Sequence, residues 1–220
     1  MTPRETQEQI PTPPVGTAHD RVYRKLRTMI LHGEVAPGAS MTIRGIAEQL
    51  GTSTMPVRES LRRLVAEGAL TMSKSGRIST PELTNDRIEE LASIRALLEP
   101  ELAARALPRA HLALIERLQA LNRQIATLVQ DGARQGYVRA NLEFHRTLYL
   151  RAQAPAMLAL TETVWLQSGP TLQALYAKQQ QTRSVEAHQK IIAALKAGDE
   201  PGLRLAVRAD VTGGLRMLVS

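Results

Sequence analysis

The chain has 220 residues, a length that suits one large domain or two modest ones. Its 28 basic and 21 acidic side chains give a net charge of +7, and most of the basic residues are arginine. Because the guanidinium group pairs with phosphate in a planar fork, this excess favours a polyanionic partner. The absence of cysteine excludes a disulfide scaffold, a thiolate nucleophile and a Cys-ligated zinc finger.

The sequence predicts no membrane span, because it contains no run of about 18 apolar residues. Its N-terminus also lacks the apolar core of a signal peptide. Residues 1–17 are rich in proline and poor in large apolar side chains, so we expect a flexible tail there. These features together predict a cytoplasmic protein without a membrane partner.

Three helices are expected in an N-terminal module that covers residues 18–81. The first ends near Gly33 and carries apolar side chains at helical spacing, namely Val22, Leu26, Met29 and Ile30. A short second helix runs from Ile43 to Leu50 and is closed by Gly51. The third helix has two faces: Val57, Leu61 and Leu64 point inward, whereas Thr54, Arg58 and Arg62 share an outward face.

The flanks of the third helix complete this module. Thr52, Ser53 and Thr54 supply capping hydroxyls before the helix, and Pro56 suits its first turn. Between Leu70 and Thr80, a turn at Ser75-Gly76 separates short runs of polar and β-branched residues. This pattern predicts a β-hairpin.

Residues 82–220 are expected to be almost entirely helical. Alanine and leucine patterning with few aromatic residues is typical of an antiparallel helical bundle. Glycine and proline breaks predict about six helices in it. These breaks are Pro108, Gly132, Pro155, Gly169-Pro170, Gly198 and Gly213-Gly214.

The outward face of the third helix is predicted to read DNA. The major groove admits one helix, and residues near the N-terminus of that helix reach the base edges. Arg58 is the best candidate for a base contact, since a guanidinium can form two hydrogen bonds with guanine. Thr52, Ser53 and the helix N-terminus suit a phosphate, because unpaired N–H groups and the helix dipole favour an anion.

Lys74 and Arg77 lie beside the hairpin turn, where they could touch the flanking DNA backbone or the minor groove. The alternative for the helix is that Arg58, Arg62 and Arg63 are solvated surface charges that pair with Glu59 and Glu67. The combination of turn, cap, two-faced helix and hairpin favours the DNA-reading interpretation.

Four polar residues of the second module could meet inside the bundle. Asn141 and His145 share one helix face, His188 lies on a later helix beside Ile191 and Ile192, and Asp210 lies on the last helix. Imidazole together with carboxylate or amide oxygen suits Zn, Mn, Fe or Ni. The alternative is that His145 and His188 only form hydrogen bonds, with Asn141, Asp210 or a ligand.

Arg95 is expected to face the same interior, where a lone buried charge is costly. Glu99, one helical turn on, could be its partner. Alternatively, Arg95 binds a carboxylate of a small effector. Tyr149 and Trp165 are candidates for lining such an effector pocket.

Residues 20–81 resemble the winged-helix domain of the GntR family of bacterial transcription regulators. The resemblance rests on Ile30…Gly33, Pro37-Gly38, the IAEQLG run at 46–51, the PVRESLRRL run at 56–64, and Glu67-Gly68. It implies a winged helix-turn-helix that binds an operator as a homodimer through Arg44, Thr54, Arg58, Arg62 and the wing around Gly76. Family members often have arginine where this chain has Thr54, which implies a different operator base at that position.

Residues 85–217 resemble, more loosely, the all-helical FCD domain, the effector domain of the fatty-acid-regulator (FadR-type) branch of that family. The matching words are Arg95…Glu99, Phe144-His145, and His188…IIAAL…Gly198-Asp199. Many FCD domains hold a divalent metal with one aspartate and three histidines. In this chain Asn141 stands where that aspartate falls, and Asp210 stands where the third histidine falls. The resemblance also implies an organic-acid effector.

The resulting prediction is a homodimeric transcription regulator on a palindromic operator, controlled by a small organic acid in the bundle, with Zn, Mn, Ni or Fe as a candidate cofactor. One alternative is a DNA-binding architectural protein whose bundle only dimerises. Another is a metal-dependent enzyme that uses His145, His188 and Asp210, but an enzyme would have no purpose for the DNA module, so we expect no catalytic residues. The effector, the operator and the sign of regulation do not follow from the sequence.

Overall fold

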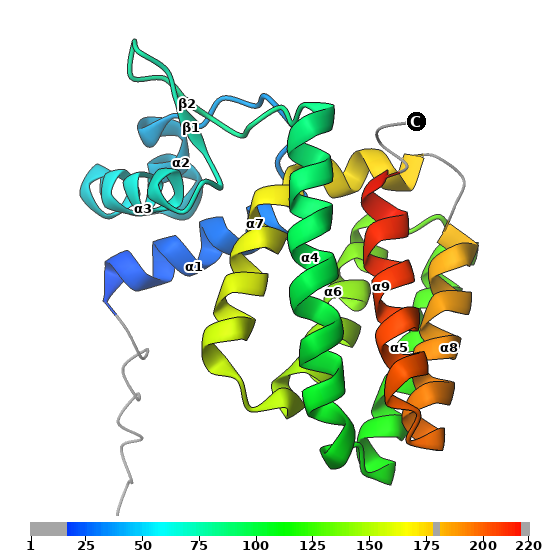
Figure 1. Cartoon of the computed structure of the whole chain (residues 1–220). Helices are drawn as coiled ribbons and strands as arrows, with labels where there is room; N and C mark the ends of the chain where they lie inside the picture. Colours follow the sequence, from blue (N-terminus) through cyan, green and yellow to red (C-terminus); the bar gives the residue numbers. More distant parts are fainter. Residues whose placement is uncertain (1–16, 178–180, 217–220) are drawn as a thin grey trace, which may run out of the picture.

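The computed structural model describes residues 17–177 and 181–216. A small unit of three helices and a two-stranded sheet precedes a larger bundle of helices (Figure 1). This architecture confirms the predicted fold class, a winged helix-turn-helix followed by an all-α bundle. The predicted tail lies outside the described residues, except for Thr17.

The N-terminal unit contains α1 (Ala18–Leu31), α2 (Ile43–Leu50) and α3 (Thr54–Ala66). Thr17 begins α1 with a reciprocal cap: its hydroxyl accepts from the Asp20 N–H at 3.2 Å, and the Asp20 carboxylate accepts from the Thr17 N–H at 3.0 Å. The apolar faces of these helices form one core, with Val22, Leu26, Ile30, Val57, Leu61 and Leu64 buried. Gly51 links α2 to α3 with φ 59°, a left-handed conformation that costs other residues about 1–2 kcal/mol.

The predicted hairpin is confirmed as a short antiparallel wing. Strand β1 (Thr71–Met72) pairs with β2 (Ile78–Ser79), so that Thr71 lies opposite Ser79. Ser40 adds an isolated bridge to Ser79, which ties the wing to the segment before α2. The turn contains Gly76 at φ 81°, again a conformation that favours glycine.

The bundle consists of α4 (Asn85–Ala106), α5 (Leu112–Gln130), α6 (Arg134–Tyr149), α7 (Pro155–Ala177), α8 (Gln181–Ala197) and α9 (Glu200–Arg216). Short 3-10 turns at Leu107–Arg109 and Leu150–Ala152 follow α4 and α6. Helix α4 packs against α9 and α7, while α5 packs against α6 and α8 (Figure 1). No helix in the described part of the chain is long and apolar enough to cross a membrane.

Two of the predicted helix breaks are wrong. Gly169-Pro170 lies within α7, and Gly213-Gly214 lies within α9. At Gly169 the reason is close packing, because a Cβ there would lie 2.2 Å from the carbonyl oxygen of Ile30 in α1. Contact between the two units therefore outweighs the local preference of glycine and proline to end a helix.

Helix α7 joins the bundle to the N-terminal unit. Leu166 is buried in the core of the N-terminal unit, although it belongs to the bundle sequence. The Gln167 amide donates a hydrogen bond to the backbone oxygen of Glu67 at 2.9 Å, and Arg27 pairs with Glu162 at 3.2 Å. A shift of α7 would therefore displace its contact residues in α1 and at the end of α3.

Candidate DNA-reading surface and metal site

The outward face of α3 carries the residues predicted to read DNA. Thr54, Arg58 and Arg62 are exposed there, because the opposite face of the helix is anchored in the core. Arg62 pairs with Glu59 at 3.2 Å, as the surface-charge alternative predicted. No carboxylate in the described part of the chain lies within ion-pair distance of Arg58. Its guanidinium is therefore available to a partner.

The N-terminus of α3 is open to an anion. Ser53 precedes the helix, but its hydroxyl makes no capping hydrogen bond, so it satisfies none of the first-turn N–H groups. Thr52 is half-buried beside it, and Pro56 lies in the first turn. Free N–H groups at a helix N-terminus favour a phosphate, as the sequence predicts.

Sequence reasoning missed Met55. This side chain is 67% exposed on α3, immediately after Thr54. An apolar side chain on such a face can contact the methyl group of thymine. Its exposure could have been predicted, because Met55 does not share the helix face of the inward-pointing Val57, Leu61 and Leu64.

The remaining predicted DNA contacts lie on α2 and on the wing. Arg44 is exposed in the first turn of α2, and Lys74 is exposed beside Gly76 at the tip of the wing. Arg77 donates from Nε to the Ser40 hydroxyl at 3.3 Å, which fixes its side chain along the wing. As contacts to DNA, these residues stay predictions.

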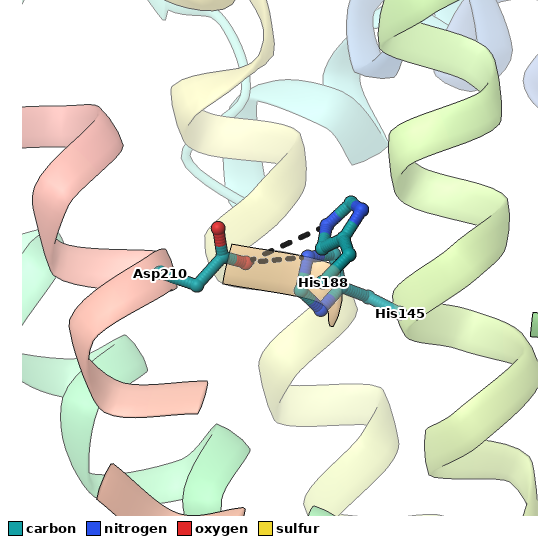
Figure 2. Close-up of side chains that lie close together, drawn as sticks. All are labelled: His145, His188 and Asp210. Carbon is teal, nitrogen blue, oxygen red and sulfur yellow. Dashed lines mark ion pairs between the residues drawn. The ribbon is translucent and has the colours of Figure 1, made fainter. Parts of the chain in front are cut away.

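Three of the four predicted metal ligands meet inside the bundle. His145 comes from α6, His188 from α8 and Asp210 from α9 (Figure 2). Asp210 Oδ2 lies 3.0 Å from His145 Nε2 and 3.7 Å from His188 Nε2. Metal–ligand bonds of about 2.0–2.1 Å place neighbouring ligand atoms roughly 3.0–3.4 Å apart. The 3.0 Å separation lies in this range and the 3.7 Å separation is longer, while all three candidate ligand atoms lie within 4.8 Å of one another.

A hydrogen bond on the far side of each ring orients the histidines. His188 Nδ1 lies 3.1 Å from Asn122 Oδ1, while the Asn122 amide nitrogen donates to the Val185 carbonyl at 3.1 Å. Since the amide nitrogen is used there, Asn122 Oδ1 accepts a proton from His188 Nδ1. The lone pair of His188 then resides on Nε2 and points to Asp210.

The same logic applies to His145. The Tyr149 hydroxyl donates to Glu99 Oε2 at 2.9 Å, so its oxygen accepts from His145 Nδ1 at 3.1 Å. His145 Nε2 faces Asp210 Oδ2 at 3.0 Å, a hydrogen-bond distance. Metal-binding histidines are typically held in this way, with the ring nitrogen that does not bind the metal donating to an outer partner.

Burial sets the charge state of the cluster. It lowers the pKa of His188 to about 3, so this ring is neutral near pH 7. Burial opposes ionisation of Asp210, but the hydrogen bond from His145 and the positive charge of nearby groups, Arg95 among them, hold the pKa of Asp210 below its ordinary value. His188 Nε2 has no hydrogen-bond partner among the described residues, although it is buried.

This cluster fits a divalent metal. A neutral imidazole acceptor that faces an ionised carboxylate across a buried gap is unfavourable, unless a proton or a cation lies between them. Two imidazole nitrogens and one carboxylate oxygen suit Zn, Mn, Ni or Fe. His145, His188 and Asp210 would hold such an ion.

The structure does not establish a role for Asn141. It is half-buried on α6, one helical turn before His145. Its amide makes no hydrogen bond within the described residues. As a fourth ligand, Asn141 stays a prediction.

Arg95 pairs with Glu99, which was the simpler of its two predicted roles. Glu99 is fully buried and also accepts hydrogen bonds from Trp165 Nε1 at 2.9 Å and from the Tyr149 hydroxyl at 2.9 Å. Burial opposes the charge of Arg95, yet Glu99 holds the pKa of Arg95 above its ordinary value. The four predicted effector residues thus form one buried network that reaches His145 through Tyr149. Their direct contact with an effector stays a prediction.

Sequence reasoning also missed two supports of His188. Asn122 orients its ring, and Phe144 stacks on it with ring centroids 3.9 Å apart. Asn122 could have been found, because it is a polar residue within the otherwise apolar inward stripe of α5. Phe144 lies directly before His145, and nothing local indicates that it packs on the other histidine.

Comparisons with known proteins agree with both halves of the molecule. Residues 18–78 match the bacterial regulatory proteins of the gntR family, and residues 90–213 match the FCD domain. The HTH-type transcriptional regulator McbR of Escherichia coli is 30% identical over 187 residues, which cover 84% of this chain and 85% of McbR. LutR of Bacillus subtilis, another HTH-type transcriptional regulator, is 26% identical over 215 residues, which cover 84% of this chain and 93% of LutR.

The solved structure of E. coli McbR/YncC superposes with a TM-score of 0.86 at 27% identity, and the match covers 93% of this chain and 98% of that chain. Because these relatives are transcriptional regulators, the enzyme alternative is wrong. The chain belongs to the GntR family of bacterial transcriptional regulators, with a GntR-type DNA-binding domain followed by an FCD domain.

Proposed function

We propose that this regulator is a homodimer that reads a palindromic operator and responds to a small organic acid, bound in the bundle together with a divalent metal. The observation that carries this proposal is the buried cluster of His145, His188 and Asp210. Burying an ionised carboxylate beside the unpartnered Nε2 of His188 costs free energy that a bundle serving only for dimerisation would not need to spend. The cluster therefore favours a sensor over an architectural protein.

In this proposal α3 lies in the major groove. Arg58 binds a guanine, and Thr54, Met55 and Arg62 contact neighbouring bases or the sugar-phosphate edge. Phosphates are bound by the residues that surround this face, which are Arg44, Thr52, Ser53, Pro56, Lys74, Gly76 and Arg77.

Dimerisation follows from the geometry of DNA. Each chain has one α3, and two major-groove half-sites on one side of the duplex are about 34 Å apart. Two chains related by a two-fold axis read a palindrome of that spacing. Binding a chromosomal operator also places the protein in the cytoplasm.

The metal would be held by His145, His188 and Asp210, with Asn141 as the fourth ligand. A bound divalent cation supplies a concentrated positive charge that can attract the carboxylate of an acid. The chain's own residues do the positioning: Asn122 and Tyr149 orient the two rings, and Glu99 holds Tyr149. Removing the metal would leave the rings in place but would remove that charge.

Helix α7 provides the route from this cluster to the DNA-binding unit. Trp165 donates to Glu99, which also holds the Tyr149 that orients His145. The next two residues, Leu166 and Gln167, contact the N-terminal unit. A change in the cluster that moves Glu99 would therefore move both faces of α7. The effector can act only through a difference in affinity between two such arrangements.

The proposal is tested by thermal unfolding of the purified protein with EDTA, with ZnCl2, and with ZnCl2 plus lactate, succinate or malate. We expect zinc to raise the midpoint, and one acid to raise it further in a concentration-dependent way. The variant His145→Ala should lose the zinc response. The control His111→Ala changes an exposed histidine that is not part of the cluster, and this variant should keep the zinc response.

Two results would contradict the proposal. If no divalent metal and no acid shifts the midpoint of the wild-type protein, the bundle is not a sensor of this kind. If His145→Ala responds like the wild type, the ligands bind elsewhere.

A further inference from the structure

A cavity of about 180 Å³ lies between α8 and α9 and reaches Asp210. Arg183, Ser184 and Lys190 line it from α8, and Gly213 and Gly214 line it from α9. One carboxylate oxygen of Asp210 points to the two histidines, and the other points away from them (Figure 2). Asp210 therefore stands between the buried cluster and this cavity.

The cations of the cavity have no anionic partner among the described residues. No carboxylate of the described residues lies within ion-pair distance of Arg183 or Lys190, although Glu186 lines the same cavity. Arg95, the cation that the sequence indicated for an acid, is already paired with Glu99. An incoming carboxylate would have to displace Glu99 from Arg95, whereas Arg183 and Lys190 can bind it at once.

Two glycines in α9 leave this cavity open. Glycine in a helix interior costs about 1 kcal/mol relative to alanine. A Cβ on Gly214 would meet no atom within 4 Å, and a Cβ on Gly213 would meet only the Arg183 guanidinium, at 3.8 Å or more. Close packing therefore does not demand glycine at either position, in contrast to Gly169, which touches α1. Their effect is to keep side chains out of the cavity wall.

The size of the cavity limits its ligand. A space of about 180 Å³ suits a small acid. Glu186 adds an acceptor for a hydroxyl group of such an acid.

We propose that the cavity between α8 and α9 is the effector site, where Arg183 and Lys190 bind the carboxylate of a small acid next to Asp210. This inference rests on the proposed function for the class of ligand, but it assigns the binding to residues outside the Arg95–Glu99 network. An acid bound there lies beside the Asp210 carboxylate and so can alter the metal cluster from its solvent side.

The test is isothermal titration of the zinc-loaded full chain with lactate, succinate and malate, one at a time. We expect at least one of them to bind, and Arg183→Ala to weaken that binding at least tenfold. Gly214→Leu should fill the cavity and abolish binding, while it raises the thermal midpoint because leucine is the better helix former. Lys196→Ala changes an exposed lysine of α8 outside the cavity and should bind like the wild type.

Zinc binding is measured separately for each variant, which distinguishes this inference from the metal proposal. Suppose that zinc does not bind but an acid does, and that Arg183→Ala weakens the binding of the acid. The cavity is then supported as the effector site, and the metal-binding part of the proposed function is contradicted. The inference is overturned if Arg183→Ala and Gly214→Leu bind the acid as the wild type does, or if none of the three acids binds the wild type.

Discussion

The reading face of α3 and the polar cluster of the bundle use similar charged groups in opposite surroundings. Arg58 is exposed and has no ion-pair partner in the part of the chain that the structure describes, so water stabilises its charge and any suitable polyanion can approach it. Arg95, Glu99 and Asp210 are largely buried, and each is held by named partners. In such a low-dielectric interior, adding one proton or one charged ligand strongly changes the electrostatic energy of the cluster. The exposed face is suited to reading, and the buried cluster is suited to sensing.

If the buried charges were as dispensable as the exposed ones, this contrast would fail. We expect Glu99→Ala to lower the free energy of unfolding by about 3–5 kcal/mol, because it leaves the Arg95 charge buried and unpaired. Glu143→Ala removes an exposed glutamate paired with Arg117, and should change the free energy of unfolding by about 1 kcal/mol or less. Urea unfolding followed by circular dichroism measures both. Equal losses would contradict the account.

The pH dependence of the free energy of unfolding tests the contrast between buried and exposed groups at His188. In the unfolded chain its pKa is near 6.5, and in the folded chain burial lowers the pKa to about 3. The unfolded state therefore binds a proton first, so the stabilisation is complete above pH 6.5 and is lost as the pH falls toward 3. The expected slope is about 1.4 kcal/mol per pH unit.

The slope is measured by urea unfolding at pH 7, 6 and 5 in EDTA. His188→Gln should flatten it, whereas His111→Gln, at an exposed site, should keep it. An identical slope in His188→Gln would remove His188 as its source.

Trp165→Phe tests whether the two regions are connected. This change removes a hydrogen bond to the buried Glu99 carboxylate, which is expected to cost about 1.5–3 kcal/mol. Amide hydrogen exchange should increase at residues 30–34 and 66–69, where the N-terminal unit meets α7. Leu160→Ala, at an exposed position of the same helix, is the control. If amide exchange at those residues is unchanged in Trp165→Phe, α7 does not couple the buried cluster to the N-terminal unit.

The smallest expected effect on folding comes from the reading face itself. Arg58→Ala should weaken binding to an operator selected from random duplexes by about 1–3 kcal/mol and relax its sequence preference, with thermal stability unchanged. Arg208→Ala, an exposed arginine of α9, should bind the operator normally. Fluorescence anisotropy measures both affinities. Retained sequence preference in Arg58→Ala would remove this residue from base reading.

The two regions also differ in how much of them the sequence could predict. In the N-terminal unit, the helices, the wing and the outward placement of Arg58 follow from periodicity, capping and turn residues, which are local signals. In the bundle, the convergence of His145, His188 and Asp210 was expected from the family resemblance, because spacing places each on a helix face but does not bring the helices together. The orientation of both rings depends on Asn122 and Tyr149, which are contacts between helices.

The errors have one physical origin. Gly169-Pro170 and Gly213-Gly214 were expected to end helices, since local propensity favours a break at such pairs. At Gly169 the approach of α1 decides instead, and at Gly213-Gly214 the helix continues beside a cavity. Both depend on residues distant in sequence, which a local pattern does not contain.

The central claim is that ligand in the bundle changes how the N-terminal unit reads DNA. It is tested most directly by anisotropy titration of the selected operator with wild-type protein in EDTA, in ZnCl2, and in ZnCl2 with succinate or malate. The account predicts that affinity differs between these conditions by about 5- to 150-fold, the range of a 1–3 kcal/mol coupling. Equal affinity in all conditions, with zinc and acid binding demonstrated on the same protein, would contradict it.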